Sequence, residues 1–328
     1  MDSCLAHRGL VGAESRSRRN RPSQHGRGAP AMSAEGYRAG FVTFVGRPNV
    51  GKSTLMNALV GEKVAITSSK PQTTRHAIRG IVHRDNGQLI IVDTPGVHRP
   101  RTLLGQRLND LVQSTLSEVD VIALCVPATD DVGPGDTFIA NEILKYPRAR
   151  KIALITKTDS ATKDQIATRL MEVDQLADWE TLIPLSALTG EQLDVVVREI
   201  LALMPESDPL YPPEDTSEQT AEVRIAELIR EATLEGVNEE LPHSIAVTID
   251  EMGEREDGLH QIFASLWVER DSQKGIMIGR GGGKLKDIGS RARAEIEALL
   301  GHKVYLSIQV KVSKEWQRDS KKITKLGL

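Results

Sequence analysis

The stretch FVTFVGRPNVGKST, residues 41–54, decides the fold of the larger part of this chain. An apolar strand leads into a turn that matches the pattern G-x-x-x-x-G-K-[ST], and the residues after the turn are typical of a helix. The match is carried by Gly46, Gly51, Lys52 and Ser53. Glycines let backbone N–H groups surround phosphate oxygens, and the helix N-terminus adds positive potential. The stretch therefore predicts the phosphate-binding loop of a nucleotide-binding domain.

The side chains of this loop have predicted roles at a nucleoside triphosphate. Lys52 is expected to reach the β and γ phosphates, and the Ser53 hydroxyl is expected to bind Mg²⁺. Asn49 either helps a monovalent cation to take the place of an arginine finger or merely shapes the loop. Val50 and Thr54 complete the predicted nucleotide contacts of the loop.

Short apolar strands alternate with helical stretches from residue 40 onward, as in GFVTFVG, QLIIVDTPG, DVIALCVPA and KIALITKTD. Continuous apolar strands between helices are typical of a mostly parallel sheet with helices on both faces. We therefore predict an α/β P-loop domain over residues 39–205.

A second element of the predicted site is QLIIVDTPG, which places an acidic residue at the carboxyl end of a strand, where ligands of such sheets bind. Asp93 is expected to act on Mg²⁺ through its water shell, and the Gly96 N–H is expected to meet the γ phosphate. The polar loop SSKPQTTRH lies between the two elements and fits a switch that orders around the triphosphate. Thr74 is expected to close on Mg²⁺, with Thr73 as the alternative.

The stretches LITKTD and SALTG predict the base that is bound. The Asp159 carboxylate can accept both N1–H and the 2-amino group of guanine, a pair of donors that adenine does not present. Lys157 is expected to lie over the base. The loop that gives the guanine oxygen a backbone N–H is predicted to consist of Ser186, Ala187 and Leu188. The nucleotide is therefore predicted to be GTP.

Two positions differ from the residues usual in such sites. Thr156 stands where the motif N-K-x-D has asparagine, so we expect this loop to lose its tie to the phosphate loop and to bind nucleotide more weakly. Val97 stands where many such enzymes have the glutamine that orients the attacking water, so unaided turnover should be on the order of 10⁻⁴ to 10⁻³ s⁻¹. The predicted catalytic residues of this GTPase are Lys52, Thr74, Asp93 and Gly96.

A stretch rich in Pro, Asp and Ser, MPESDPLYPPEDTSEQ, ends the alternating pattern and is typical of a linker, which we assign to residues 206–219. Residues 220–328 follow another order: helix, strand, strand, helix, helix, strand. Alternating apolar residues in SIAVTIDEM and VYLSIQVKV indicate half-buried strands. This order predicts a second, α+β domain.

The stretch IMIGRGGGKLKDIG, residues 276–289, is a glycine turn of another kind. Aligning Gly283 with the second glycine of a phosphate loop puts Ile278 at the first glycine and Leu285 at the Mg²⁺-binding hydroxyl, so the match fails. The stretch does match G-x-x-G between two helices after a β-hairpin, where a backbone can clamp about four nucleotides of a single strand. The predicted RNA-binding residues are Gly279, Arg280, Gly281, Gly282, Lys284 and Lys286.

Local charge supports this second site. The formal charge of the whole chain is −3, which gives no overall nucleic-acid signature. From residue 274 onward, however, the chain has 13 lysines and arginines against 5 acidic residues. This cluster predicts phosphate binding; the alternative is a solvated basic face beside a glycine-rich helix junction.

The N-terminal residues 1–38 are rich in Arg, Ser and Gly, so we interpret them as a disordered tail. An organellar targeting sequence and a true start at Met32 are the alternatives. The chain has 2 cysteines, too few for a disulfide framework, and Cys125 is expected to be a small buried hydrophobe. Because there is neither a long apolar span nor a secretory signal, we expect a cytoplasmic protein.

The combination of GRPNVGKSTLMNAL, KPQTTRH, IVDTPGVH, TKTD, SALTG and IMIGRGGGKLKDIG resembles the Era-type GTPases, bacterial proteins that join a GTPase domain to a C-terminal KH domain of the second type. The resemblance covers roughly residues 40–322. It implies assembly of the small (30S) ribosomal subunit, with the KH domain holding single-stranded sequence near the 3′ end of 16S ribosomal RNA. It also implies a K⁺ ion beside Asn49 and, as an alternative to the cytoplasm alone, the periphery of the inner membrane. We expect a monomer and no DNA partner.

Two other functions remain open. One is an RNA-binding scaffold whose nucleotide site is only structural, against which the intact set of Lys52, Ser53 and Asp93 argues. The other is a GTPase of transfer-RNA modification or membrane traffic, which would normally carry a different appended domain.

Overall fold

The computed structural model describes residues 36–68, 74–95, 102–236 and 244–328. The predicted tail, apart from its last residues, therefore lies outside the described residues, as do Thr73, Gly96 and Val97. The first described strand begins at Arg38.

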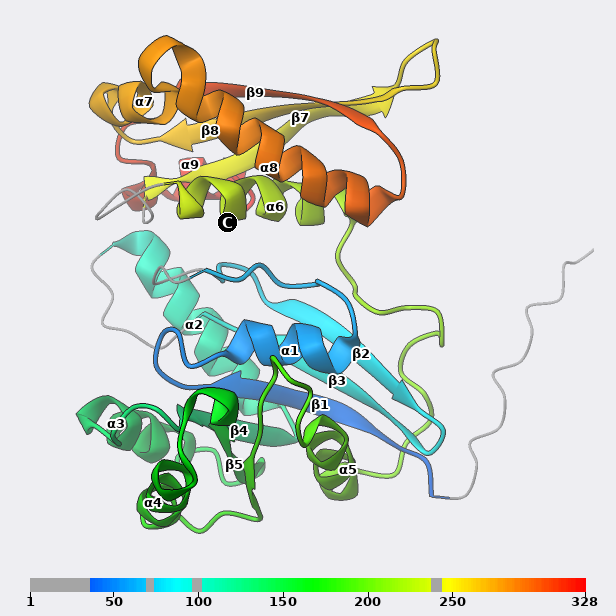
Figure 1. The fold of residues 1–328 in the computed structure, drawn as a ribbon, viewed down its shortest axis with the longest axis vertical. Helices are drawn as coiled ribbons and strands as arrows, with labels where there is room; N and C mark the ends of the chain where they lie inside the picture. Colours follow the sequence, from blue (N-terminus) through cyan, green and yellow to red (C-terminus); the bar gives the residue numbers. More distant parts are fainter. Residues whose placement is uncertain (1–35, 69–73, 96–101, 237–243) are drawn as a thin grey trace, which may run out of the picture. The chain divides into compact units, whose positions relative to one another are not determined.

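The first part of the chain forms a six-stranded sheet among the described residues, in the order β2-β3-β1-β4-β5-β6 (Figure 1). Its strands are β1 (Arg38–Val45), β2 (Ile78–Arg84), β3 (Gly87–Asp93), β4 (Val121–Pro127), β5 (Arg150–Thr156) and β6 (Leu182–Pro184). Strand β2 is antiparallel to β3, and the other neighbours are parallel. The prediction of a mostly parallel sheet is confirmed.

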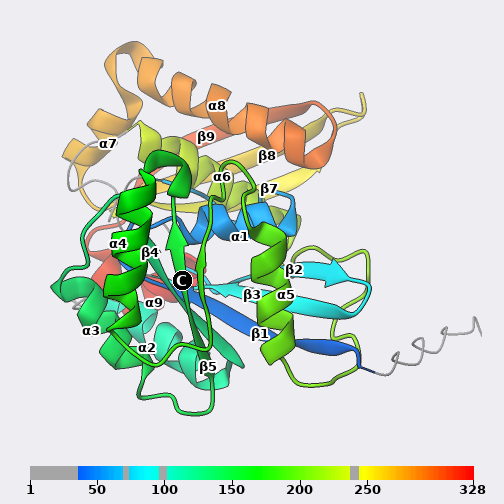
Figure 2. The ribbon, with the colours of Figure 1, turned by 60° about the horizontal axis from the view of Figure 1, so that its bottom comes forward.

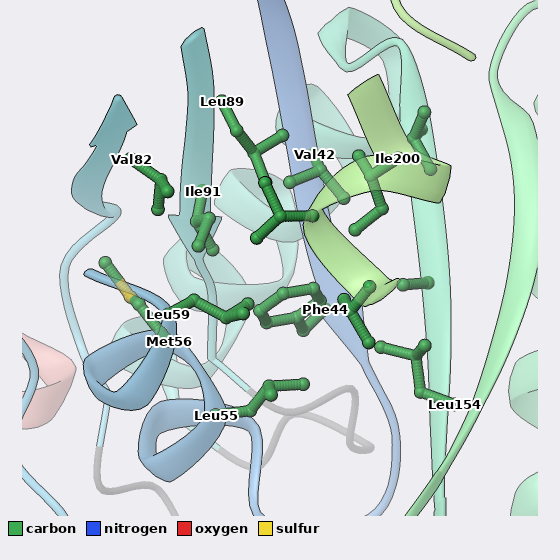
Figure 3. Packing of buried hydrophobic residues seen from close by; sticks show 14 of the residues in the cluster. Val42, Phe44, Leu55, Met56, Leu59, Val82, Leu89, Ile91, Leu154 and Ile200 are labelled. Atoms are coloured by element: carbon green, nitrogen blue, oxygen red, sulfur yellow. The ribbon is translucent and has the colours of Figure 1, made fainter. Parts of the chain in front are cut away.

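Helices cover both faces of this sheet (Figure 2). They are α1 (Lys52–Val60), α2 (Leu103–Glu118), α3 (Pro134–Ile143), α4 (Lys163–Asp174) and α5 (Leu193–Leu203), with the short 3-10 helix η1 (Thr158–Ser160) after β5. Helices α1 and α5 pack on one face, where Phe44 lies among Leu55, Leu59 and Ile200 (Figure 3). Helices α2, α3 and α4 pack on the other face. The two apolar layers hold the carboxyl ends of the strands in place beneath the predicted site.

The second part of the chain is an α+β unit whose sheet has the order β7-β8-β9. Its elements are α6 (Ala221–Glu235), β7 (Ala246–Glu254), β8 (His260–Val268), α7 (Asp271–Ile278), η3 (Arg280–Gly282), α8 (Gly283–Leu300), β9 (Val304–Val312), η4 (Trp316–Arg318) and α9 (Ser320–Lys325). Strand β7 is antiparallel to β8, and β8 is parallel to β9. Residues of α6 and α8, among them Ile229 and Ile288, form a core with Ile262 of β8. The predicted order of elements is confirmed as far as β9, whereas η4 and α9 were not predicted.

The connection between the two parts runs from the end of α5 at Leu203 to the start of α6 at Ala221. It lies along β2, where the Ile81 N–H donates to the Thr216 carbonyl at 2.9 Å. The domain boundaries that we assigned within this interval remain a prediction.

Cys125 lies in the middle of β4 and is fully buried. Burial raises the pKa of its thiol to about 12, so the prediction of a small buried hydrophobe is confirmed. Among the described residues, no helix is both long enough and apolar enough to cross a bilayer.

Candidate nucleotide site and nucleic-acid interface

The predicted phosphate loop connects the end of β1 to the start of α1 at Lys52. Gly46 has a φ of 154°, and a Cβ there would lie 2.5 Å from the carbonyl oxygen of Cys125 in β4. Only glycine fits this close approach of two backbones. Gly51 has a φ of 99°, in the left-handed region, and it directly precedes the helix. The absence of a side chain at Gly46 therefore allows both the turn of the phosphate loop and the close packing of the loop against β4.

The Lys52 ammonium group lies inside the loop. Its Nζ donates to the carbonyls of Gly46 at 3.1 Å and Arg47 at 3.0 Å. Burial lowers the pKa of Lys52, and the negative charge of Asp93 partly opposes this effect. Of the other loop residues, Val50 is buried, and Asn49 is exposed with a φ of 64°. The ammonium is therefore held at the place where the phosphates are predicted to bind.

Three predicted metal residues converge at the end of β3. Asp93 Oδ2 accepts hydrogen bonds from Ser53 Oγ at 2.9 Å and from Thr74 Oγ1 at 2.9 Å. Asp93 is fully buried, and burial raises its pKa, while Lys52 and the two hydroxyls oppose that rise. Thr74 is itself buried, with 7% of its surface exposed. The structure thus brings together residues that are 40 positions apart in the sequence.

This oxygen cluster suits a hard divalent cation. Mg²⁺ prefers oxygen ligands and usually binds through one or two carboxylates, hydroxyls and the phosphates of its nucleotide. Asp93 Oδ1 is buried and has no side-chain hydrogen-bond partner among the described residues. A buried carboxylate oxygen in this position is costly without a cation or a further donor. The residues therefore fit a magnesium ion.

The predicted guanine-recognising carboxylate is held by two hydroxyl groups. Ser186 Oγ donates to Asp159 Oδ1 at 2.5 Å, and Ser160 Oγ donates to Asp159 Oδ2 at 2.8 Å. These bonds, that of Ser186 first, lower the pKa of Asp159 and keep it ionised. Ser186 is buried, whereas Asp159 and Ser160 are exposed. The carboxylate therefore faces solvent in a fixed orientation, as guanine recognition requires.

The other residues of the predicted base site lie around Asp159. Lys157 has a φ of 58°, and this left-handed residue turns the chain from β5 into η1. Ala187 packs partly against the core, and the side chain of Leu188 is 81% exposed. The Thr189 N–H donates to Ser186 Oγ at 3.1 Å, which shapes the loop.

The expectation that Thr156 breaks the tie between the base loop and the phosphate loop is wrong. Thr156 Oγ1 donates to the Val50 carbonyl at 2.7 Å, and Thr156 is buried. The hydroxyl group reaches the phosphate loop because β5 lies beside β4, two strands from the loop's own β1. The tie is therefore kept by a hydroxyl in place of an amide.

The second glycine turn joins α7 to α8. Gly279 has a φ of 71°, and a Cβ there would lie 2.7 Å from Cβ of Lys284, so only glycine fits. Gly281 and Gly282 also have positive φ angles, of 58° and 76°. Arg280 and Gly281 are exposed. The turn thus presents backbone and a basic side chain to solvent, as predicted for a nucleic-acid clamp.

A groove lies beside this turn, with a volume of about 460 Å³. It is lined by Gly282, Leu285, Lys286, Gly289, Ser290, Arg293, Leu306, Ser307 and Ile308. Its wall on β9 is partly apolar, and its wall on α8 carries lysine and arginine. Within the described part of the chain, Arg280, Lys284 and Lys286 form no ion pair, whereas Arg291, Lys303 and Lys311 do. The three predicted RNA-binding cations are therefore not neutralised by an acidic partner within the described residues.

Some residues of these sites were not predicted from the sequence. Ser160 and the side chain of Ser186 fix Asp159, but only the loop backbone of Ser186 was expected to act. A serine beside an aspartate is too common to be a signal. Gly96 was predicted to act in catalysis but lies outside the described residues.

The fold and the site together define the class of P-loop GTPases that carry a C-terminal KH domain. Residues 41–178 match the family model described as 50S ribosome-binding GTPase, and residues 240–317 match that of the KH domain. The chain is a GTPase, and it binds GTP.

Relatives of known name narrow this class. The chain is 57% identical over 301 residues to GTPase Era of a Nocardioides species, covering 89% of this chain and 96% of that protein. It is also 57% identical over 295 residues to GTPase Era of Mycolicibacterium smegmatis, covering 89% and 99%. The chain therefore belongs to the Era GTPase family.

Solved structures agree with this assignment. A variant of Aquifex aeolicus Era bound to GDP and aluminium fluoride matches with a TM-score of 0.85 and 35% identity, over 88% of this chain and 99% of that chain. Era in complex with MgGDPNP and nucleotides 1506–1542 of 16S ribosomal RNA matches with a TM-score of 0.85 and 36% identity, over 89% and 99%.

Proposed function

We propose that this GTPase binds single-stranded sequence near the 3′ end of 16S ribosomal RNA and assists assembly of the small (30S) ribosomal subunit. The observation that carries the proposal is the exposed turn at Arg280 and Gly281 beside a groove lined by cations. The Era structure that holds a 16S fragment supports the choice of RNA. The GTP state would control how firmly the RNA is held.

The hydrolysis mechanism follows from the residues around the phosphate loop. Lys52, in the loop, is placed to stabilise the negative charge that builds up on the β and γ phosphate oxygens. Ser53, Thr74 and Asp93 would hold Mg²⁺, with Asp93 acting through water. When bound, this ion neutralises charge on the β and γ phosphate oxygens. Position and electrostatics therefore supply the rate, since no side chain forms a covalent intermediate.

Asn49 is proposed to assist a K⁺ ion near the phosphates. Its left-handed φ of 64° and its exposure set this side chain at the surface of the phosphate loop. A monovalent cation there would take the electrostatic role of an arginine finger. Turnover in K⁺ that exceeds turnover in Na⁺, with the difference lost in Asn49→Ala, is the expected result.

The proposed partner sets the location. An assembly factor of the small subunit works where ribosomes are made, so we propose a monomeric protein of the cytoplasm. The periphery of the inner membrane is the second location that the family resemblance suggests.

The phosphate assignment is tested with Lys52→Ala. Loss of the ammonium should lower GTP turnover at least about 100-fold, because one preorganised charge at the reacting phosphates is removed. Phosphate release from the full chain measures it. Turnover equal to that of the wild type would refute the assignment.

The RNA assignment is tested with Arg280→Asp and Gly281→Asp. Each places a negative charge at the turn, and we expect binding of a 3′-end 16S oligonucleotide to weaken by about 2 kcal/mol or more, roughly 30-fold. Lys303→Asp is the matched control, because Lys303 is exposed and does not belong to the turn. Its Nζ pairs with Glu297 Oε2 at a distance of 2.7 Å. Fluorescence anisotropy measures the affinity. Equal losses in all three variants would indicate nonspecific electrostatics and would contradict the clamp.

A further inference from the structure

Arg75, the residue that follows Thr74, is buried against the C-terminal part of the chain, residues 221–328. Arg75 is 3% exposed, and its Nη1 donates to the carbonyl of Ile245, just before β7, at 2.5 Å. Its guanidinium carbon lies 5.8 Å from the ring centroid of Trp316 in η4, a cation–π distance. Thr74, which is predicted to close on Mg²⁺, and the buried Arg75 are thus consecutive residues.

The other end of the same loop contacts a different element of the C-terminal part. Thr67 donates to Glu231 Oε1 of α6 through its N–H at 2.9 Å and its hydroxyl at 3.2 Å. Lys63 pairs with Glu231 Oε2 at 2.6 Å. The chain on both sides of residues 69–73 is therefore bonded to the C-terminal part.

Buried charge makes the contact at Arg75 specific. Burial lowers the pKa of Arg75 to about 9, so the guanidinium is still charged at neutral pH. Arg230 and Glu227 of α6 form a buried ion pair at 2.6 Å whose charges act on Arg75. Burial by itself would raise the pKa of Glu227, but Arg230, His76 and Arg75 together lower it. Separating these buried charges is costly, because each would be left without compensation.

A chain of hydrogen bonds leads from this contact to the start of α7. Trp316 Nε1 donates to the Ser244 carbonyl at 3.2 Å, and Gln273 Nε2 donates to Ser244 Oγ at 3.0 Å. Gln273 Oε1 in turn accepts from the backbone N–H groups of Glu269 at 2.9 Å and Arg270 at 3.0 Å. These bonds fix the start of α7, the helix that ends at the turn.

We propose that Arg75 is the positioning residue that couples the nucleotide site to the RNA-binding groove. Consecutive Cα atoms are about 3.8 Å apart, so a withdrawal of Thr74 from Asp93 that exceeds about twice this distance must displace Arg75. In the structure Thr74 lies on Asp93, Arg75 lies against Trp316, and the turn at Arg280 is exposed. GTP and RNA therefore favour the same arrangement and should strengthen each other's binding. The inference rests on the proposed function.

The experiment measures a coupling ratio on the full chain. The affinity for a 3′-end 16S oligonucleotide is determined with GDPNP and without nucleotide, and the affinity for GDPNP is determined with and without that RNA. The two ratios must agree, because coupling between two binding sites is reciprocal. For the wild type we expect a ratio of about fivefold or more.

Arg75→Met keeps an unbranched apolar stem and removes the charge and donors of the guanidinium. We expect its coupling ratio to fall to within about twofold of unity, while GDPNP affinity without RNA and basal turnover stay within about threefold of the wild type. Arg79→Met is the matched control, since Arg79 on β2 is partly exposed and pairs with Glu218 at 2.8 Å outside this contact. It should keep the wild-type ratio. If Arg75→Met does not fold, Arg75→Lys replaces it, because the lysine cannot both reach the Ile245 carbonyl and stack as a plane on Trp316.

Each outcome decides between specific statements. A wild-type ratio of fivefold that persists in Arg75→Met, or in Arg75→Lys where that variant is used, would overturn the role of Arg75 and leave the proposed function intact. A wild-type ratio of one would overturn the coupling itself, although GTP turnover and RNA binding remained. Absence of RNA binding by the wild type would overturn the proposed function instead. A lower melting temperature with an unchanged ratio would show that Arg75 only holds the two parts together, which also overturns the inference.

Discussion

Replacing Ser186 with alanine should weaken GTP binding by removing a buried hydroxyl that orients Asp159. The hydroxyl donates to Asp159 Oδ1 at 2.5 Å, and Ser186 has no exposed surface. A hydrogen bond to an ionised group contributes about 1.5–3 kcal/mol. In the alanine variant the Asp159 carboxylate must be oriented when GTP binds, so the affinity for GTP should fall about 10- to 150-fold.

Ser160→Ala is the matched control on the same carboxylate. Ser160 Oγ donates to Asp159 Oδ2 at 2.8 Å but is exposed, so water can replace it. Its loss should change GTP affinity by less than about fivefold. The contrast isolates burial, because both variants delete one hydroxyl group from one acceptor.

Titration calorimetry with GTP and with ATP is the assay. Ser186→Ala should reduce the preference for GTP over ATP, because the carboxylate that reads guanine is no longer fixed. Since the Ser186 bond is the largest cause that lowers the pKa of Asp159, the variant should also lose GTP binding at a higher pH than the wild type when the solution is acidified. Melting temperatures check the fold, because Ser186 Oγ also accepts from the Thr189 N–H. Equal effects of the two serine variants would refute the reasoning.

Two further predictions concern the residues beneath the nucleotide. Thr156→Val should lower the free energy of unfolding by about 1 kcal/mol and weaken GTP binding, whereas Thr156→Ser should not, because only the hydroxyl donates to the Val50 carbonyl. Denaturant unfolding measures the stability, and GTP titration measures the affinity. A serine variant that is as impaired as the valine variant would contradict this prediction. Asp93→Asn should flatten the dependence of melting temperature on pH in the nucleotide-free protein. Burial raises the pKa of Asp93, so its contribution to stability is complete below the ordinary carboxyl pKa and is lost as pH rises through the folded pKa. A variant with the wild-type pH profile would contradict this assignment.

Local sequence was sufficient where the chemistry is local. The phosphate loop could be predicted because Gly46, Gly51, Lys52 and Ser53 lie within 8 residues and their spacing is set by one turn and one helix start. The apolar strands likewise predicted the sheet. The direction of β2 was also available in principle, since only 2 residues separate it from β3 and so short a connection joins only antiparallel strands.

Contacts between distant residues could not be predicted from one sequence. The bond from Thr156 to Val50 joins residues 106 positions apart, and that from Arg75 to Ile245 joins residues 170 positions apart. Motif reasoning treats Thr156 as a missing amide, because the motif records residue types and not the reach of a hydroxyl from a neighbouring strand. Arg75 lies in the stretch KPQTTRH, but the motif assigns no partner to it. Its role depends on packing that exists only once both parts have folded.

The burial of Cys125 at the centre of β4 provides a natural reporter of opening. A thiol whose pKa is raised to about 12 hardly reacts with alkylating reagents, so labelling must wait until the strands around it separate. In a Cys4→Ser background, the rate of labelling would therefore report how often the first sheet opens, without any attached dye. Measured with GDP, with GDPNP and with RNA, that rate would show how strongly each ligand holds the sheet closed.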